Sequence, residues 1–226
     1  IPVPAGFVVT TDAHRFYLKN GQVPEGLPEQ LRAMADALDA VHFAVRSSAT
    51  VEDSATASWA GQFESYLFVT HDRLLEALQD CWRSASSERV EAYRRRQGLG
   101  TEPISLAVVV QRMIPSVISG TCFTRHPVLL LPDEMVMEAV RGLGQALVDG
   151  STTPDHYRVR KTDLGIIQKI VSEQDGDSTQ KLTDAQIGAL AEIALRIEKH
   201  YGSSQDIEWA FDGSDFHIVQ ARPITG

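Results

Sequence analysis

The chain has 226 residues, enough to bury a sizeable core in one large domain or in two lobes around a cleft. Its net charge of −9, from 21 basic and 30 acidic residues, disfavours loose attraction to nucleic acid or anionic lipid. No apolar run reaches the roughly 20 residues that a membrane helix needs, and the two cysteines, Cys81 and Cys122, form neither a disulfide framework nor a Cys-x-x-Cys metal motif. We therefore expect a folded, cytoplasmic protein with no nucleic-acid or membrane partner.

The first half of the sequence alternates helical and strand patterns. Helices are expected after the capping residues at 10–12, around Leu31 to Leu38, and from Leu74 to Tyr93, where apolar residues recur at helical spacing. Short strands are expected at 41–45 and 66–69. Between these two strands, small and polar residues predict a loop.

The second half is richer in strand signals. Strands are expected at Leu106–Val110 and then at 135–140, 156–160 and 165–171, followed by a helix that opens with a Thr183/Gln186 capping box. A hairpin of 206–211 and 216–221 closes the chain, turning at 212–213. This mixture without strict alternation predicts an α+β fold with two lobes, 1–105 and 106–226.

The C-terminal hairpin gathers polar side chains on one face, because residues two apart on a strand point the same way. A three-residue loop, 213–215, would pair Asp206 with Arg222 and Glu208 with Gln220. The same register would bring apolar residues together on the reverse face, pairing Ile207 with Ala221 and Trp209 with Val219. Because polar and apolar faces separate cleanly, this register is favoured.

Two carboxylates beside an amide and a guanidinium suit a metal–nucleotide site. Mg2+ prefers hard oxygen ligands and keeps substrate phosphates in its shell, and arginine binds phosphate oxygens through forked hydrogen bonds. The alternative is a structural salt bridge between Asp206 and Arg222 across the two strands, worth roughly 0.2–1 kcal/mol. Spacing alone leaves both interpretations open.

A second candidate is the strand that leads into Arg46, Ser47 and Ser48, with the small-residue loop ending near Gly61. Positive charge and backbone N–H groups in such a loop can bind phosphates. An ordinary polar loop is the competing interpretation, since neither a P-loop nor a complete GxGxxG motif occurs.

Five ordered stretches resemble the N-terminal nucleotide-binding domain of the phosphoenolpyruvate synthase, pyruvate phosphate dikinase and rifampicin phosphotransferase group, which has an ATP-grasp fold. They are IPVPAGFVVTT, AVRSSATVEDSATASWAGQFESYLFV, VVVQRMIPSVISGTCFTRHPV, EAVRGLGQALVDGSTTPDHYRV and QDIEWAFDGSDFHIVQARPITG. Together they cover nearly the whole chain.

The resemblance implies roles for particular residues. It implies catalytic contacts to ATP phosphates by Arg46 and Arg222, and Mg2+ coordination by Asp206, Glu208 and Gln220. It further implies a loop over the triphosphate, an adenine-side strand near 111–114, and a ribose or inter-lobe contact. The residues expected to bind ATP are Arg46, Ser58, Gly61, Gln62, Gln111, Met113, Glu138, Gln220 and Arg222.

By the same resemblance, ATP is the substrate, and it is cleaved to AMP while the β-phosphoryl group passes to a histidine on a separate swivelling domain. That histidine would phosphorylate pyruvate or a drug bound by another domain, in the same or another chain. None of the seven histidines here lies in a setting like the phosphoacceptor motif, so we expect this chain to be incomplete for the relay.

The sequence also departs from the family. Members usually carry a glycine-rich segment with a phosphate-binding lysine before IPVP, where this chain starts, and their stretch corresponding to Tyr17–Arg46 is longer. Because Ile1 to Gly6 contain neither an initiator Met nor the features of a secretory signal, the start is interpreted as trimmed, processed or unresolved. A noncatalytic nucleotide-sensing module and a small ATP-grasp carboxylate–amine ligase remain alternatives.

Overall fold

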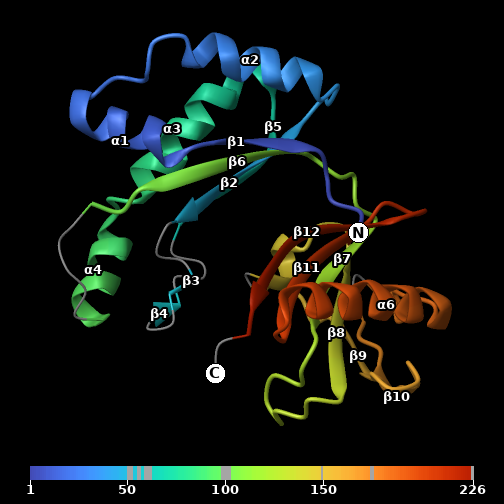
Figure 1. Cartoon of the computed structure of the whole chain (residues 1–226). Coiled ribbons are helices and arrows are strands. Elements are labelled where there is room, and N and C mark those ends of the chain that lie inside the picture. The colour runs from blue at the N-terminus through green and yellow to red at the C-terminus, as the bar shows by residue number, and fades with distance from the viewer. Residues whose placement is uncertain are drawn as a thin grey trace. The chain divides into compact units, whose positions relative to one another are not determined.

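The computed structural model describes residues 1–49, 53–54, 57–58, 63–97, 103–148, 150–173 and 176–224, and the chain divides into two compact units. The N-terminal unit is Ala5–Met113, and the C-terminal unit is Ile114–Gly226 together with Ile1–Pro4 (Figure 1). Each unit combines helices with an antiparallel sheet, which confirms the predicted α+β class.

The division falls after Met113, not near residue 105 as the sequence analysis places it. The reason is the strand β6, Leu106–Arg112, which hydrogen-bonds to two strands of the first unit and lies inside their sheet. The strand is apolar because it lies inside the N-terminal sheet, and it does not begin a new lobe.

The N-terminal unit is built on a four-stranded sheet with the order β1-β6-β2-β5. Helices α1, α2 and α3 lie over one face of this sheet (Figure 1). Besides β6, the unit contains β1 Gly6–Val9, α1 Thr11–Asn20, α2 Leu27–Ala37, β2 Phe43–Ala49, β3 Asp53–Ser54, β4 Ala57–Ser58, β5 Ser65–Val69, the 3-10 turn His71–Arg73, α3 Leu74–Ser84 and α4 Glu88–Gln97.

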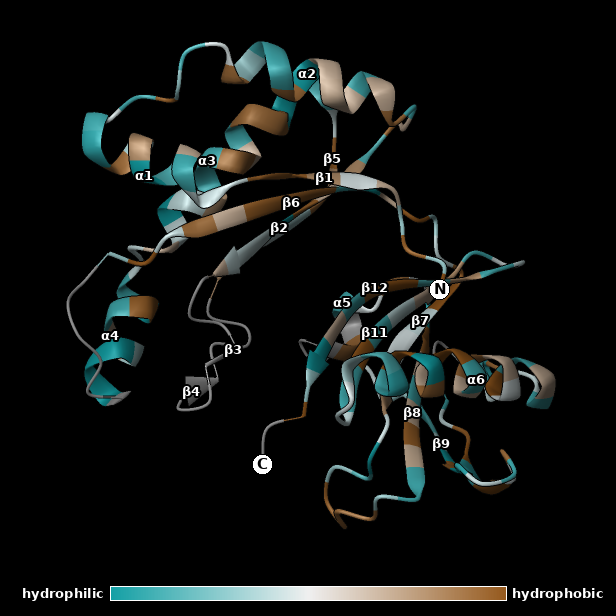
Figure 2. Ribbon diagram, viewed as in Figure 1, coloured by the Kyte–Doolittle hydropathy of each residue, from teal (hydrophilic) through white to brown (hydrophobic). Residues whose placement is uncertain are grey.

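Alternate residues of β2 and β6 point toward the helices and form the core of this unit. Phe43, Val45, Val108 and Val110 are buried there against side chains of α3 that include Trp82. The hydrophobic residues along β6 are brown in Figure 2. The single helix expected at 74–93 is two helices, because the chain leaves the helical path at 85–87.

The C-terminal unit is a six-stranded antiparallel sheet with the order β10-β9-β8-β7-β11-β12. One long helix, α6, covers one face of it (Figure 1). The elements are β7 Ile118–Phe123, β8 Glu134–Arg141, α5 Gln145–Val148, β9 Asp155–Arg160, β10 Ile166–Ile170, α6 Asp184–Tyr201, β11 Gln205–Phe211 and β12 Phe216–Pro223.

The face toward α6 is apolar, and the predicted capping box opens that helix. The Thr183 hydroxyl accepts from the Gln186 N–H at 3.3 Å, and the Gln186 side chain accepts from the Thr183 N–H at 2.8 Å. From α6, Ile187, Leu190 and Ile197 pack against the sheet. The strand residues that pack against α6 alternate with residues on the opposite face, where Glu138 lies between the buried Val136 and Val140 on β8.

Strand β7 has no counterpart among the predicted elements. Its middle residue, Gly120, lies so close to β8 that an added Cβ would be 1.8 Å from the Glu138 carbonyl oxygen and 2.7 Å from the Trp209 ring. Glycine is depleted in strands on average, but here only glycine allows the close approach.

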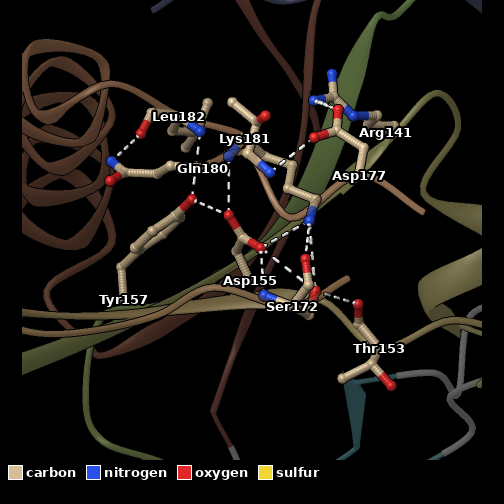
Figure 3. A network of polar contacts seen from close by, with 10 residues as sticks. Arg141, Thr153, Asp155, Tyr157, Ser172, Asp177, Gln180, Lys181 and Leu182 are labelled. Atoms are coloured by element: carbon tan, nitrogen blue, oxygen red, sulfur yellow. Dashed lines mark hydrogen bonds and ion pairs between the residues drawn. The ribbon is translucent and has the colours of Figure 1, made fainter. Parts of the chain in front are cut away.

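A buried polar network joins β9 to the segment that precedes α6 (Figure 3). The Lys181 ammonium and the Asp155 carboxylate are 2.9 Å apart, and both side chains are fully buried. Asp155 also accepts hydrogen bonds from the Tyr157 hydroxyl at 2.6 Å and from the Ser172 N–H at 2.9 Å. These contacts hold the chain entering α6 against the sheet. Among the described residues, no helix is both long and apolar enough for a membrane span.

We predict that the stability of the N-terminal unit falls in acid because of His14. This α1 side chain is fully buried against Trp82, and its Nδ1 accepts from the Leu106 N–H at 2.9 Å. Burial lowers its pKa from 6.5 to about 4. A lowered pKa in the folded state favours the neutral form, so this contribution is complete above pH 6.5 and is lost as the pH falls toward 4.

Urea unfolding at pH 7 and pH 4 measures the effect. The unmodified chain should lose roughly 2–3 kcal/mol more than the His14→Asn variant, which keeps an acceptor but does not titrate. The exposed control, His200→Asn, should follow the unmodified chain. Equal acid sensitivity in all three proteins would contradict the assignment.

We also predict that Lys181→Met destabilises the chain by about 3–5 kcal/mol, because it leaves the Asp155 carboxylate buried without its cation. The matched control is Lys169→Met, whose partner Asp184 is largely exposed and whose loss should change the free energy of unfolding by less than about 1 kcal/mol. Urea titrations of both variants make the comparison. Similar effects from the two substitutions would show that the buried pair contributes no more than a surface pair.

Candidate functional site

The C-terminal hairpin pairs its polar residues as the sequence predicts. Across β11 and β12, Asp206 lies opposite Arg222 and Glu208 lies opposite Gln220. Ile207 lies opposite Ala221. The polar end of the hairpin therefore has the predicted register.

Nearer the turn, the predicted register is wrong. Trp209 pairs with Ile218 rather than with Val219, and four residues, 212–215, form the loop instead of three. Asp212 explains the loop, because its Oδ1 accepts from the N–H groups of Ser214 and Asp215 at 2.9 and 2.8 Å. These backbone hydrogen bonds also hold the pKa of Asp212 well below its usual value.

A β-bulge at Val219 takes up the extra residue. Without the bulge, a four-residue loop would put Glu208 opposite Val219 and would mix polar with apolar side chains. The bulge restores the pairing of Glu208 with Gln220, so the four polar residues stay together despite the longer loop.

The Asp206–Arg222 contact is close and partly buried. Arg222 donates from Nε and Nη2 to the same carboxylate oxygen, Asp206 Oδ2, at 2.8 and 2.7 Å. The Asp206 side chain is 12% exposed and that of Arg222 is 35% exposed. The other oxygen, Asp206 Oδ1, is buried and has no hydrogen-bond partner among the described residues.

This arrangement fits a hard cation that brings other ligands with it. Asp206 Oδ1 is a buried acceptor without a donor, and Glu208 and Gln220 supply further oxygens on the same face. Within the described residues, no three acidic, histidine or cysteine side chains gather into a complete metal-binding group. A cation here would therefore depend on substrate oxygens and water for the rest of its shell, as Mg2+ usually does.

The pair Glu208–Gln220 belongs to a polar row that crosses five strands of the sheet. Strand pairing places Glu208 opposite Thr121 of β7, Thr121 opposite Glu138 of β8, and Glu138 opposite His156 of β9. All five residues are half-buried and lie on the face away from α6. We call this set, from Gln220 to His156, the polar row.

Two members of the polar row, Thr121 and His156, were not singled out by the sequence analysis. The strand β7 was not predicted, so its pairing with β8 and β11 could not be anticipated. The prediction of Glu138 came from resemblance alone, and strand pairing now puts this residue on the same face as Glu208.

In the N-terminal unit, Arg46 and Gln111 share the face of the sheet that points away from the helices. Arg46 pairs with Val109 of β6, and Gln111 pairs with Ala44 of β2, whereas the alternating neighbours Val45 and Val110 face the helical core. Strand β2 extends through Ala49, so Arg46 and the two serines lie within the strand rather than after it. The Ser47 hydroxyl donates to the Glu64 carbonyl oxygen at 2.9 Å.

The other predicted ATP-binding residues of the N-terminal unit lie outside this pair of strands or at its end. Met113 follows β6, and its N–H donates to the His42 carbonyl oxygen at 3.0 Å. Ser58 is in the short strand β4, and Gly61 and Gln62 lie outside the described residues.

A separate apolar pocket lies among β1, α1 and α2, lined by side chains that include Phe7, Phe16, Leu27 and Met34. It contains none of the predicted site residues. Its apolar lining offers little to bind a triphosphate, and it is not part of the candidate site.

The chain is similar to a known protein family and to curated proteins. A family model described as the pyruvate phosphate dikinase AMP/ATP-binding domain matches residues 15–226. A probable phosphoenolpyruvate synthase of Methanocaldococcus jannaschii is 35% identical over 286 aligned positions, which cover 100% of this chain and 24% of that protein. A rifampicin phosphotransferase of Streptomyces sviceus is 36% identical over 279 positions, covering 100% of this chain and 32% of that protein.

The chain thus spans about a quarter to a third of the length of these two curated relatives. Among solved structures, D-alanyl-alanine synthetase A from Vibrio cholerae is similar over 99% of this chain and 51% of that one, with a TM-score of 0.49 and 10% sequence identity.

We predict that Asp206 and Arg222 stabilise the folded chain as a coupled pair. Two hydrogen bonds between charged, partly buried groups should give a coupling energy of about 1–2 kcal/mol, above the value for an exposed pair. The measurement is a double-mutant cycle of Asp206→Asn, Arg222→Ala and their combination in urea unfolding. The exposed pair Arg160–Asp163 gives the matched control cycle. A coupling no larger than the control would mean that the contact observed here contributes little to the fold.

Proposed function

Because the chain belongs to the family of pyruvate phosphate dikinase AMP/ATP-binding domains, we propose that it binds Mg-ATP as the nucleotide-binding portion of a dikinase-type phosphotransferase. The observation that carries the proposal is the hairpin cluster, in which Asp206, Glu208, Gln220 and Arg222 share one face of the C-terminal sheet. In this family, two acids, an amide and a guanidinium together can hold Mg2+ and phosphate groups. A surface salt bridge would need only one acid and the guanidinium.

The proposed roles follow from the chemistry of each side chain. Asp206, Glu208 and Gln220 would hold Mg2+, and Asp206 has a buried oxygen, Oδ1, that receives no hydrogen bond from any described residue and can serve this purpose. When bound, Mg2+ neutralises charge on the phosphate oxygens. Positioning and charge neutralisation supply most of the catalysis in phosphoryl transfer.

Arg222 combines two functions in this proposal. Its Nε and Nη2 atoms hold Asp206, which fixes the guanidinium in place. A guanidinium has five N–H donors, so others can bind phosphate oxygens while the carboxylate orients the group. A pre-oriented arginine stabilises the charge that develops on the phosphoryl oxygens without having to reorganise.

The N-terminal unit would supply the remaining contacts. Arg46 would bind phosphate oxygens, and Gln111 and Met113 would contact the adenine side of the nucleotide. Support for Arg46 and Gln111 comes from their common place on the face of the sheet opposite the core under α1, α2 and α3. Ser58, Gly61 and Gln62 are proposed to close over the triphosphate, and Glu138 to bind the nucleotide from β8.

For the whole reaction, we propose cleavage of ATP to AMP with transfer of the β-phosphoryl group to a histidine on a separate domain. The relatives named phosphoenolpyruvate synthase and rifampicin phosphotransferase are about five and about four times as long as this chain, respectively, which leaves room in them for further domains. Pyruvate and a rifampicin-like drug are the two acceptor classes that these names suggest.

The first test is calorimetric titration of the purified chain with a nonhydrolysable ATP analogue, with and without Mg2+. We expect binding that depends on Mg2+ and that falls at least about tenfold in Glu208→Ala and in Arg222→Ala, since each change removes a charged contact to the phosphates or their cation. The control is Glu192→Ala, on the exposed surface of α6 and thus on the other side of the sheet.

Far-UV circular dichroism establishes that each variant is folded. Mg2+-independent binding, or equal affinity of the Glu208→Ala and Glu192→Ala variants, would contradict the proposed site. The absence of binding by a folded, unmodified chain would contradict the proposal as a whole.

A further inference from the structure

The apolar pocket of the N-terminal unit contains none of the residues assigned to nucleotide binding. It is lined by β1, α1 and α2 and has a volume of about 460 Å3, within the roughly 300–1,000 Å3 typical of small-molecule sites. Two of its lining residues, Phe7 and Val9, pack into the core beneath the helices, so the pocket lies on the helix-covered side of the sheet. Arg46 and Gln111 point to the opposite side. The proposed nucleotide site therefore gives this pocket no role.

The pocket leaves large apolar side chains in contact with solvent. Val9 and Leu31 line it and are buried, at 7% and 3% exposed. Phe16 and Met34 also line it, but they are 45% and 48% exposed. A concave set of half-exposed apolar side chains gains free energy when an apolar ligand covers it.

The walls of the pocket are held in place by the core beneath them. His14 fixes α1 against β6, because its Nδ1 accepts from the Leu106 N–H at 2.9 Å and its ring stacks on Trp82. The connection from α1 to α2 is short, and the glycines at its two ends, Gly21 and Gly26, have φ angles of 70° and 75°. A ligand would thus meet a preformed surface, which reduces the ordering cost of binding.

The charged groups of the pocket favour a positively charged ligand. Of the described residues that line it, Asp12 and Glu25 are acidic and none is basic. Asp12 is already paired with Arg15, at 2.5 Å. The Glu25 carboxylate is exposed and has no hydrogen bond or ion pair within the part of the chain that the structure describes. Glu25 is therefore the group that a cationic ligand would meet.

Other classes of ligand fit this pocket less well. A phosphate or a carboxylate would approach two acids and no base. A divalent cation needs several oxygen ligands, and the described residues contain no group of three acidic, histidine or cysteine side chains that could hold one. A neutral apolar molecule would fill the pocket but would leave Glu25 without a partner.

We infer that this pocket is a second ligand site, for a small molecule with an apolar body and a protonated amine. The apolar body lies against Phe16, Leu31 and Met34, and the ammonium group lies beside Glu25. The inference goes beyond the proposed function and does not depend on it, because it uses none of the nucleotide-binding residues.

The test uses three probes that share one two-ring body: 4-phenylbenzylamine, 4-phenylbenzyl alcohol and 4-phenylbenzoate. At about pH 7 they are cationic, neutral and anionic, respectively. NMR titration of the isotopically labelled full chain gives both the location of binding and the dissociation constant. For a probe of about 15 non-hydrogen atoms, we expect the amine to bind with a dissociation constant on the order of 0.1–1 mM. Amide shifts should change in β1, α1 and α2 and stay constant in the C-terminal unit.

The charge of the ligand is tested at Glu25. The amine should bind about threefold more tightly than the alcohol, as expected for one exposed ion pair, and the carboxylate should bind more weakly than either. In Glu25→Gln, the advantage of the amine over the alcohol should disappear while the affinity for the alcohol stays the same. The matched control is Glu29→Gln, which makes the same change in the first turn of α2 at a residue that does not line the pocket. It should keep the advantage.

The apolar wall is tested at Phe16. Phe16→Ala should weaken the binding of all three probes by at least about fivefold, because an aromatic ring supplies a large contact area. The control is Leu18→Ala, on the same helix, where Leu18 is 44% exposed and does not line the pocket. Its affinities should match those of the unmodified chain. Melting temperatures identify any variant that fails to fold, and if Phe16→Ala does so, the Glu25 and Glu29 variants decide the outcome.

Equal affinity for the three probes would overturn the assignment of a cationic ligand, and so would an amine preference that persists in folded Glu25→Gln. Shift changes confined to other elements, or no binding of any probe well above the expected dissociation constant, would overturn the pocket as a ligand site. None of these results bears on Mg-ATP binding, which is measured separately at the hairpin residues.

Discussion

The alignment of β11 with its two neighbours is the constraint on which the candidate site depends. Because side chains alternate between the two faces of a sheet, a shift by one residue would move Asp206 and Glu208 into the core and bring Ile207 and Trp209 out. Burial of Trp209 and Ile207 beneath α6 makes such a shift unfavourable by several kcal/mol, at roughly 1.5–3 kcal/mol for each large apolar side chain. The packing of the apolar face thus determines which polar groups meet on the other.

The same separation of faces explains how much could be predicted. The pairs Asp206–Arg222 and Glu208–Gln220 followed from the sequence because a mismatch would have mixed polar and apolar residues. The four-residue loop and the bulge at Val219 did not follow, because they depend on hydrogen bonds that the Asp212 carboxylate accepts from the N–H groups of Ser214 and Asp215. The turn at Asp212 and the pairing of the polar residues are compatible only because the strand contains a bulge, and the hydrophobic pattern of the sequence does not predict a bulge.

The larger errors of the sequence-based prediction, the missing strand β7 and the misplaced lobe boundary, come from strand pairing between residues far apart in the sequence. Strand β7 contains a serine, a glycine and a threonine in succession, and its place depends on the fit of Gly120 against β8 and the Trp209 ring. Likewise, β6 has the apolar character of any central strand, and only its pairing with β1 and β2 assigns it to the N-terminal unit. The helices were easier, since their periodicity and the Thr183 capping box are local in sequence.

Two carboxylates on opposite faces of the C-terminal sheet differ in how well they are satisfied. On the helix side, the buried Asp155 has a full set of partners in Lys181, Tyr157 and two backbone N–H groups. On the other side, Asp206 Oδ1 is equally removed from solvent but has no donor among the described residues. A buried acceptor without a hydrogen bond lowers the stability of the folded chain by about 1–3 kcal/mol. A bound cation or donor would remove this cost. A ligand that satisfies it would bind the folded chain preferentially and so stabilise it. Within the described residues, Asp206 Oδ1 is therefore an acceptor that a ligand at the candidate site would satisfy.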